Sequence, residues 1–427
     1  MFNISATLCN GNPIYQSTFV SENLLQLMMK DLNKKQIVIV LVLAFLVALE
    51  PLSIDLFLPA FLQIADYFKT TETQVQLSLS TFLGGFAIGQ LIWGPLADRY
   101  GRKKPLAISM TIFTIASVGC VYVYSIEQLW GMRFIQAIGG CGGIVIARAV
   151  VTDYFDKSQT LNIFTILALI MGVAPIIAPI IGNQLIKIGG WEFTFEAMAI
   201  LGLIGVLATI FILPETFSKK NNLAKYNQLK NSSVLANYLD ILKSRQFLVY
   251  TLIAGLVNGA LMIYIGTAPF LIMKKAGISG DIFSAIFATN ALGMMLSASL
   301  TSILQKRYET KKIVAFAAVM MCVSALIFTV LSEFGASIPA LLVVLFFYVF
   351  PMGMLFPTTT DLAMTPFPEN KSGSASSLFG SMQLGLAFLM TMLLGKLSDG
   401  TIFNIGSAFL LSGLIIIPLL FIRQHKN

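Results

Sequence analysis

Two carboxylates lie inside the first long apolar stretch of the chain, where a charged side chain is costly. Glu50 and Asp55 are separated by Pro51 and three further residues, and Pro59 follows shortly after. An ionisable residue at the centre of a membrane helix costs about 2.5–3.5 kcal/mol, so its presence usually marks a function. The prolines remove backbone hydrogen bonds, so we expect a kinked helix beside a cavity, where both carboxylates could bind and release protons. Asp55 could instead be a structural cap near the end of the helix.

A buried arginine is expected in a later apolar stretch. Arg133 follows Glu127 by six residues and is surrounded by apolar sequence. Its guanidinium keeps its charge, so it could hold a neighbouring carboxylate ionised until a proton or a ligand displaces it. The alternative is an arginine that packs its stem or extends to the membrane surface. The only histidine of the sequence, His425, is in the C-terminal tail, so a proton relay within the apolar stretches must use carboxylates.

Other kinds of chemistry are not indicated. The four cysteines (Cys9, Cys120, Cys141 and Cys322) are far apart and have neither a disulfide nor a metal spacing. The sequence contains no G-x-x-x-x-G-K-[ST] phosphate loop, no nucleophile set and no cofactor loop. We therefore expect no metal, no cofactor and no enzymatic activity.

Two further runs combine glycine and proline, one at the end of an apolar stretch and one inside another. The first reads Gly94-Pro95-Leu96-Ala97-Asp98-Arg99-Tyr100-Gly101-Arg102-Lys103-Lys104-Pro105-Leu106. The second reads Gly172-Val173-Ala174-Pro175-Ile176-Ile177-Ala178-Pro179-Ile180-Ile181-Gly182. Glycine and proline permit close helix contact and bending, so packing alone would explain the second run. Near the end of another stretch lie Arg148 and Asp153, where we expect a gate or a plain ion pair.

The elements that position these residues must be membrane-spanning helices. Hydrophobic residues make up 56% of the 427 residues and charged residues only 11%, whereas a soluble domain carries about 25% charged residues. Each crossing needs about 20 apolar residues. The predicted spans are 37–62, 74–97, 105–124, 127–153, 159–187, 191–213, 246–272, 281–304, 311–334, 337–364, 372–396 and 401–422.

The distribution of basic residues predicts the orientation. Most of them fall in connections on the same side as the N-terminus, and the positive-inside rule then places both termini in the cytoplasm. The net charge of +8 is thus spread between spans, so we expect no nucleic-acid partner. The one long polar connection divides the spans six and six. The predicted parts are an N-terminal tail (1–36), a six-helix bundle (37–213), a cytoplasmic linker (214–245), a second six-helix bundle (246–422) and a C-terminal tail (423–427).

The run after the second span resembles the G-x-L-a-D-r-x-G-r-k-x-x-l signature of the major facilitator superfamily in residue type and in position. The resemblance implies that Asp98 and Arg102 form a latch at the inner face, which holds the outward-facing state without contacting substrate. The other signature residues assigned to this conformational gate by resemblance are Gly94, Arg99, Gly101 and Lys103.

Three more segments resemble drug exporters of that superfamily. Arg133-Phe134-Ile135-Gln136-Ala137 is similar to the R-x-x-q-G pattern linked to proton coupling, with Ala137 in place of glycine. The run containing Gly172, Pro175, Pro179 and Gly182 resembles the antiporter motif, with Asn183 in place of its second glycine. Segment 54–60 and the serine-rich segment 372–378 resemble the Bcr/CflA group of drug exporters.

The resemblance covers residues 37 to 422 and implies an all-α membrane protein of twelve helices in two six-helix bundles, alternating access and drug:proton antiport. We expect a monomer in a bacterial inner membrane that exports drugs or other small amphipathic molecules, with Glu50, Asp55 and Arg133 in proton coupling. Two alternatives remain: an exporter or importer dedicated to one metabolite, such as a siderophore or an amino acid, and a membrane sensor or scaffold that does not transport.

Overall fold

The computed structural model describes residues 32–216, 234–397 and 401–421. Most of the predicted N-terminal tail, part of the predicted linker and the C-terminal tail with His425 lie outside these residues. Twelve helices in the described part are long and apolar enough to cross a membrane, which confirms the twelve predicted spans. No strand is assigned within these residues, so the predicted all-α class is also confirmed.

The first six spans form the N-terminal half. Its elements are α2 (Lys34–Asp55), the short 3-10 helix η1 (Leu58–Ala60), α3 (Phe61–Tyr67), α4 (Glu72–Tyr100), α5 (Lys103–Val121), α6 (Ile126–Tyr154), α7 (Lys157–Gly189) and α8 (Glu192–Phe211).

The last six spans form the C-terminal half, preceded by a short helix within the predicted linker. These elements are α10 (Val234–Leu242), α11 (Arg245–Pro269), the π-helix η2 (Phe270–Lys275), α12 (Gly280–Leu304), α13 (Thr310–Glu333), α14 (Ile338–Val349), α15 (Met352–Met364), α16 (Glu369–Leu397) and α17 (Ile402–Leu420).

Polar side chains mark where several spans begin. A serine, threonine or asparagine precedes the helix and accepts a hydrogen bond from a backbone N–H of the first turn, which otherwise has no partner. The residues that cap in this way are Asn33, Thr71, Ser125, Ser244 and Thr401.

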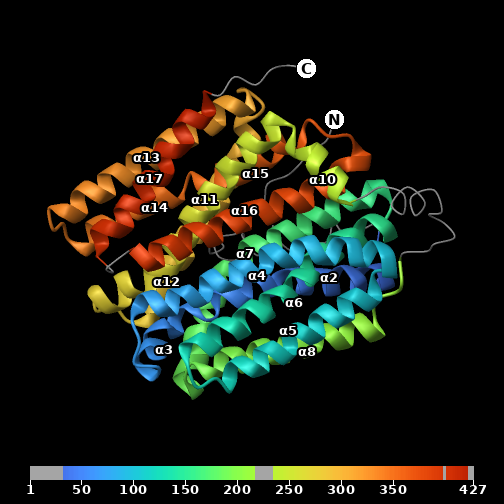
Figure 1. Cartoon of the computed structure of the whole chain (residues 1–427), viewed down its shortest axis with the longest axis horizontal. Coiled ribbons are helices and arrows are strands. Elements are labelled where there is room, and N and C mark those ends of the chain that lie inside the picture. The colour runs from blue at the N-terminus through green and yellow to red at the C-terminus, as the bar shows by residue number, and fades with distance from the viewer. Residues whose placement is uncertain (1–31, 217–233, 398–400, 422–427) are drawn as a thin grey trace, which may run out of the picture.

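The two halves repeat the same pattern of helix contacts. In the N-terminal half α2 packs on α7, α4 on α6 and α5 on α8; in the C-terminal half α11 packs on α16, α12 on α15 and α13 on α17. The halves meet along two seams, α4 with α16 and α7 with α12. In Figure 1 the N-terminal half, coloured blue to green, lies below the C-terminal half, coloured yellow to red.

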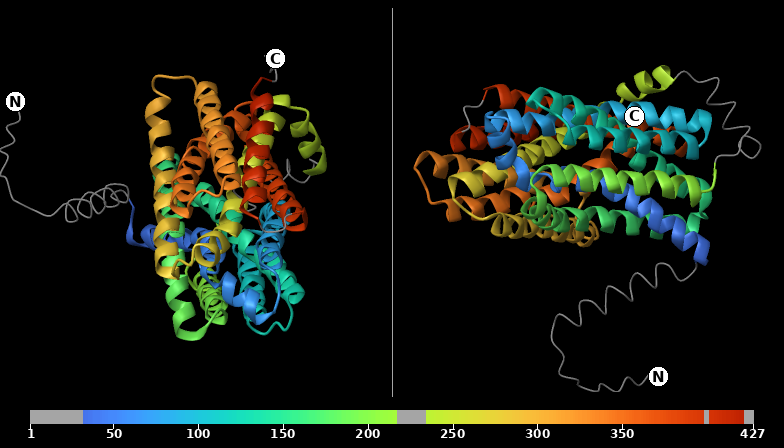
Figure 2. Two further views of the ribbon diagram at one scale, coloured as in Figure 1. Left: turned by 90° about the vertical axis from the view of Figure 1, so that its left-hand side faces the viewer. Right: turned by 90° about the horizontal axis from the view of Figure 1, so that it is seen from below.

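The two ends of the helix bundle take their names from the chain. The "linker end" holds the C-terminal ends of α4, α6 and α8 together with α10, which packs on α11 and α16 (Figures 1 and 2). The "far end" holds α3, η2 and the start of α12, at the left of Figure 1. Each span therefore runs from one named end to the other.

The first span is interrupted, where the sequence predicted a kink. Pro51 lies inside α2, but the α-helix ends at Asp55 and the chain resumes as η1, which contains Pro59. Proline has no N–H and disfavours helical geometry in the residue before it, so the continuous α-helix stops short of Pro59. The break places the carboxylate of Asp55 at the last α-helical residue.

Candidate functional site

Asp55 is a buried carboxylate at the break of the first span. Its residue is 3% exposed, and its Oδ1 atom is fully buried with no hydrogen-bond partner. Glu50, one turn and a half earlier on α2, is half-buried. The two carboxylates are close enough for their charges to interact, and Glu50 also interacts with the charge of Arg148. A buried polar atom without a partner is rare, because it loses its hydration without compensation.

Arg133 is completely buried and reaches toward α2. Its Nη1 donates to Gln136 Oε1 at 2.6 Å and its Nη2 to the backbone oxygen of Ser53 at 3.0 Å. The guanidinium carbon also lies 4.7 Å from the ring centre of Phe57 and 4.3 Å from that of Phe82. Within the described residues, no carboxylate lies within 4 Å of its nitrogens, so its link to Asp55 runs through the backbone two residues earlier.

The antiporter-like run on α7 packs between this break and the other half. A methyl group at Gly182 would overlap the carbonyl oxygen of Leu56, the residue after Asp55, so only glycine allows this approach. On its other side, the carbonyl oxygen of Pro179 accepts a hydrogen bond of 3.1 Å from Ser284 on α12. Gly172 faces Met295 of the same helix. The predicted run therefore contacts both the buried carboxylate's helix and the C-terminal half, while Pro175 lies inside the continuous helix.

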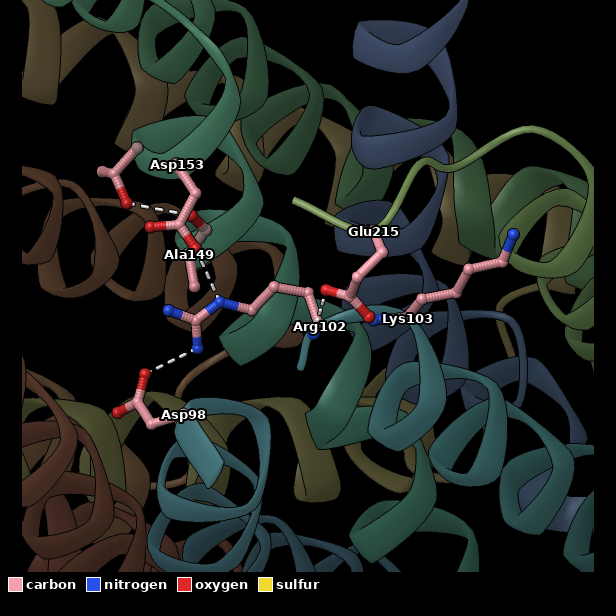
Figure 3. Close-up of polar contacts among 7 residues, drawn as sticks. Asp98, Arg102, Lys103, Ala149, Asp153 and Glu215 are labelled. Carbon is pink, nitrogen blue, oxygen red and sulfur yellow. Dashed lines mark hydrogen bonds and ion pairs between the residues drawn. The ribbon is translucent and has the colours of Figure 1, made fainter. Parts of the chain in front are cut away.

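Four charged residues form an ionic network at the linker end, which we call the linker-end cluster: Asp98, Arg102, Asp153 and Glu215. Arg102 donates through Nε to Asp153 Oδ2 at 2.7 Å and through Nη1 to Asp98 Oδ1 at 2.6 Å (Figure 3). Its side chain is 4% exposed. Burial lowers the pKa of the Arg102 guanidinium, but the charges of Asp153 and Asp98 and the hydrogen bonds to them together raise it by more, so the pKa lies above its ordinary value and the charge is kept.

Glu215 completes the linker-end cluster from the chain after α8. Its carboxylate accepts from the backbone N–H of Arg102 at 2.8 Å and of Lys103 at 3.2 Å, at the start of α5 (Figure 3). An anion at this position is stabilised by the unpaired N–H groups and the helix dipole. Gly101, with φ of 90°, makes the turn, and a side chain there would collide with Glu215. No sequence pattern pointed to Glu215, because no spacing rule connects it to a helix start so far away.

The other residues of the predicted gate lie around this cluster. Arg99 is exposed and its guanidinium carbon lies 5.4 Å from the ring centre of Tyr100. Arg148 is exposed, and the ion pair expected near the end of α6 joins Asp153 to Arg102 instead. Gly94 faces Ser377 of α16, so the signature also touches the seam with the C-terminal half.

Two ion pairs at the far end join the halves and were not predicted; we call them the far-end pairs. Lys187 Nζ on α7 lies 2.7 and 2.8 Å from the carboxylate oxygens of Asp281 on α12. Lys274 in η2 lies 2.7 Å from Glu72 Oε1 on α4. Asn183, the departure from the antiporter motif, donates to Asp281 Oδ1 at 2.7 Å. The sequence signalled Asn183 as unusual but not its partner.

No group of three or more His, Cys, Asp or Glu side chains in the described residues is placed to hold a metal ion. The geometry instead combines one buried carboxylate, a buried arginine and two helical halves joined by seams. That combination is typical of a secondary transporter, in which the substrate site lies between two repeated bundles.

Comparison with known proteins gives the family. The sequence profile of the Major Facilitator Superfamily matches residues 43–391, so the chain belongs to this superfamily. It is a multi-pass membrane protein that transports small molecules, and the predicted resemblance is confirmed at this level. It is not an enzyme family.

Its relatives include named resistance proteins. The chain is 29% identical over 90% of its length to an uncharacterized MFS-type transporter, YdgK, of Bacillus subtilis, covering 94% of that protein. It is 28% identical over 89% of its length to a bicyclomycin resistance protein homolog of Haemophilus influenzae, covering 95%. It is 29% identical over 87% of its length to the multidrug resistance protein MdtL of a Shewanella strain, covering 91%.

Solved structures agree on the fold. The crystal structure of a D-xylose–proton symporter superposes with a TM-score of 0.73 at 14% identity, over 89% of this chain and 97% of that one. A bacterial homolog of the human lysosomal transporter Spinster, in an inward-facing and unoccupied conformation, gives 0.70 at 16% identity, over 91% and 95%. These likenesses confirm the predicted major facilitator fold and carry no substrate information.

Proposed function

We propose that the chain is a proton-coupled exporter of drugs or other small amphipathic molecules. Asp55 carries this proposal. Its carboxylate is more than nine-tenths buried and its Oδ1 has no hydrogen-bond partner. Because an ionised carboxylate without a partner is costly to bury, binding of a proton or of a donor group from a ligand is favoured there. It lies at the break of α2, against the α7 run that also contacts the C-terminal half. Binding at this carboxylate can therefore be communicated to the contact between the halves.

The relatives support drugs as the substrate class. One is named for bicyclomycin resistance and another for multidrug resistance, and each aligns over most of this chain. Both relatives come from bacteria, which agrees with an inner-membrane location. The linker end is the cytoplasmic end in this proposal, because the basic connections lie there.

The direction of access follows from the same orientation. The far-end pairs hold α7 to α12 and α4 to η2, so this conformation is closed toward the outside. Export would require these contacts to open once per cycle while the seams exchange contacts at the linker end. Arg133, bound to the Ser53 carbonyl, would keep the segment before Asp55 in place during this change.

Proton movement in inverted membrane vesicles tests the proposal. A pH gradient is established by respiration, and a panel that includes bicyclomycin and ethidium is added to vesicles with wild type, Asp55→Asn or Glu50→Gln. We expect at least one compound to discharge the gradient in wild type, and Asp55→Asn to abolish the discharge. Glu50→Gln should weaken it less, because Glu50 is only half-buried.

Asp361→Asn is the matched control, since Asp361 is an exposed aspartate at the end of α15. It should behave as wild type. A discharge that persists in Asp55→Asn would refute the role of this carboxylate. A panel without any response would refute drug:proton antiport and favour an exporter or importer dedicated to one metabolite.

A further inference from the structure

A buried polar pair of the C-terminal half lies on α11 and α12, the two helices that η1 contacts just after Asp55. Tyr264 on α11 is 2% exposed and Asn290 on α12 is 4% exposed. The side-chain amide of Asn290 donates to the Tyr264 hydroxyl oxygen at 2.8 Å. The Tyr264 ring stacks on Phe287, with ring centres 5.8 Å apart and planes inclined by 11°. The hydroxyl is therefore held in one position from two sides.

The hydroxyl of Tyr264 still has a proton to donate. A tyrosine oxygen accepts through its lone pairs and donates through its own O–H, and Asn290 uses only the acceptor side. Among the described residues, no acceptor bonds this proton, and no donor bonds Asp55 Oδ1. One half thus presents an unused donor and the other an unused acceptor, both buried.

The two groups belong to elements that touch. The short helix η1, which begins just after Asp55, contacts both α11 and α12. Phe61 at the start of α3 lies 5.7 Å, ring centre to ring centre, from Phe270, the first residue of η2 directly after α11. The carboxylate charge of Asp55 acts on the hydroxyl of Tyr264, although no hydrogen bond joins the two side chains in this conformation. A relative movement of the halves changes this separation directly.

We infer that Tyr264, held by Asn290, is a positioning residue for Asp55 in the proton cycle. When the cycle brings the two side chains within hydrogen-bond distance, the Tyr264 O–H donates to the Asp55 carboxylate, and the proton that Asp55 carried leaves to water. The tyrosine keeps its own proton throughout. When the halves separate, the carboxylate loses this donor and takes up a proton again. The inference rests on the proposed proton coupling.

In this conformation, none of the other charged groups near Asp55 donates a hydrogen bond to its Oδ1 atom. Glu50 on the same helix is itself an acid, and it acts on Asp55 by charge. Arg133 on α6 donates to the Ser53 carbonyl through Nη2 and to Gln136 through Nη1, and its buried Nε–H has no hydrogen-bond partner. On α7, Gly182 lies against the carbonyl oxygen of Leu56, the residue after Asp55. Tyr264 is thus a hydroxyl donor that the opposite half can offer.

Infrared titration of the full-length protein in lipid bilayers tests this inference without a known substrate. The carbonyl band that wild type shows and Asp55→Asn lacks reports the protonated Asp55 side chain. In Tyr264→Phe, which keeps the ring and removes only the hydroxyl, we expect the midpoint of this band to move upward by about one pH unit, since a tenfold change in proton binding is one unit. Asn290→Leu should move the midpoint in the same direction but by less, because the Tyr264 hydroxyl is still present but is no longer oriented by Asn290.

Tyr348→Phe is the matched control. Tyr348 is another buried tyrosine of the C-terminal half, and its ring stacks on Phe409 at 4.4 Å. Removal of the Tyr348 hydroxyl should leave the pH midpoint of the Asp55 carbonyl band unchanged from wild type. Thermal unfolding in detergent checks that each variant is folded.

The outcomes separate the two proposals. An unchanged midpoint in Tyr264→Phe, or an equal shift in Tyr348→Phe, overturns the role of Tyr264. If the vesicle assay shows no drug-driven proton movement but Tyr264→Phe still shifts the midpoint, the export proposal fails and the contact to Asp55 stands. An absent Asp55 band at every pH in wild type overturns the inference as well.

Discussion

The charged residues at the two ends of the bundle differ in their burial and in the parts of the chain that they connect. At the linker end, the four residues of the linker-end cluster come from the N-terminal half and the chain directly after it, and the central Arg102 side chain is 4% exposed. At the far end, both far-end pairs connect one half to the other, and the side chains of Lys187 and Asp281 are 50% and 57% exposed. Buried, hydrogen-bonded charges hold strongly, whereas exposed pairs are screened by water and salt. The linker-end cluster therefore makes one half rigid, and the far-end pairs can release at little cost.

This difference refines the role implied by the family signature. The resemblance implied a latch between Asp98, Arg102 and neighbouring helix ends, and the neighbours in this structure are α6 and the chain after α8. Contacts within one half can survive a rigid-body movement of that half. The Lys187–Asp281 and Lys274–Glu72 ion pairs, which join the two halves, both lie at the far end.

Of the changes that test this difference between the two ends, removal of the Arg102 side chain should have the largest effect. Arg102→Ala leaves Asp153 and Asp98 without their counter-charge in a largely buried place, which we expect to cost about 3 kcal/mol of unfolding free energy. Denaturant unfolding in mixed micelles measures this loss. Arg99→Ala, in the same connection but exposed, should change the unfolding free energy little. Equal losses in both variants would contradict a structural role of the linker-end cluster.

Removing the carboxylate of Glu215 should have an intermediate effect. Glu215→Ala leaves two backbone N–H groups at the start of α5 without their acceptor, and loss of such a cap costs about 1 kcal/mol. Hydrogen exchange of the Arg102 and Lys103 amides should become faster in the same variant. Glu196→Ala, an exposed glutamate on α8, provides the comparison. Unchanged exchange of both amides would show that Glu215 does not protect this helix start.

Breaking a far-end pair should change conformation more than stability. Asp281→Asn removes the charge that Lys187 contacts, so we expect the far-end-open population to rise a few-fold with no measurable change in unfolding. Spin labels at the exposed positions Ile188 and Ile282 report the distance between α7 and α12. The exchanged pair Lys187→Asp with Asp281→Lys should restore the wild-type distribution, whereas Glu333→Gln should not alter it. Failure of the exchange to restore it would reject an ionic contact as the cause.

An increase in salt concentration should have the smallest effect, and it distinguishes the charged contacts at the two ends without a mutation. Raising the ionic strength from about 0.1 M to 1 M shortens the screening length from about 10 Å to 3 Å. The distance between the same two labels should shift toward the open population, by less than in Asp281→Asn. Amide exchange at Arg102 should stay the same, since its side chain is buried. A salt response of equal size at both ends would remove the distinction drawn between them.

The sequence predicted the spans well because hydropathy and length act locally. All twelve predicted spans correspond to helices. The signature run was expected between the second and third spans, but it covers the end of α4, the turn at Gly101 and the start of α5. The contact between Asp98 and Arg102 is also local, being four residues apart, and follows from spacing. The interruptions were harder to predict: the first span stops at Asp55, and the tenth is divided into α14 and α15 around Pro351. Proline indicates a disturbance but does not determine whether the helix bends or stops.

Contacts between distant parts of the chain could not be predicted from a single sequence. Glu215 meets Arg102 across 113 positions, and Lys187 meets Asp281 across 94. Neither pair has a periodicity that reveals it. No sequence pattern pointed to the buried pair of Tyr264 on α11 and Asn290 on α12. The role of Asp55 in proton coupling stays a prediction, since the structure gives the burial and the neighbours of this carboxylate but not its binding and release of protons.

The seam between α4 and α16 has a mechanical consequence. Ser377 and Ser381 on α16 donate to the backbone oxygens of Gln90 and Ala87 on α4, at 2.9 Å each. A helix presents an equivalent carbonyl one turn further along, about 5.4 Å away. Sliding along the axis by that step would exchange these hydrogen bonds, whereas pulling the helices apart would lose them. The seam between α4 and α16 therefore resists separation of the two helices more than it resists sliding along their axes.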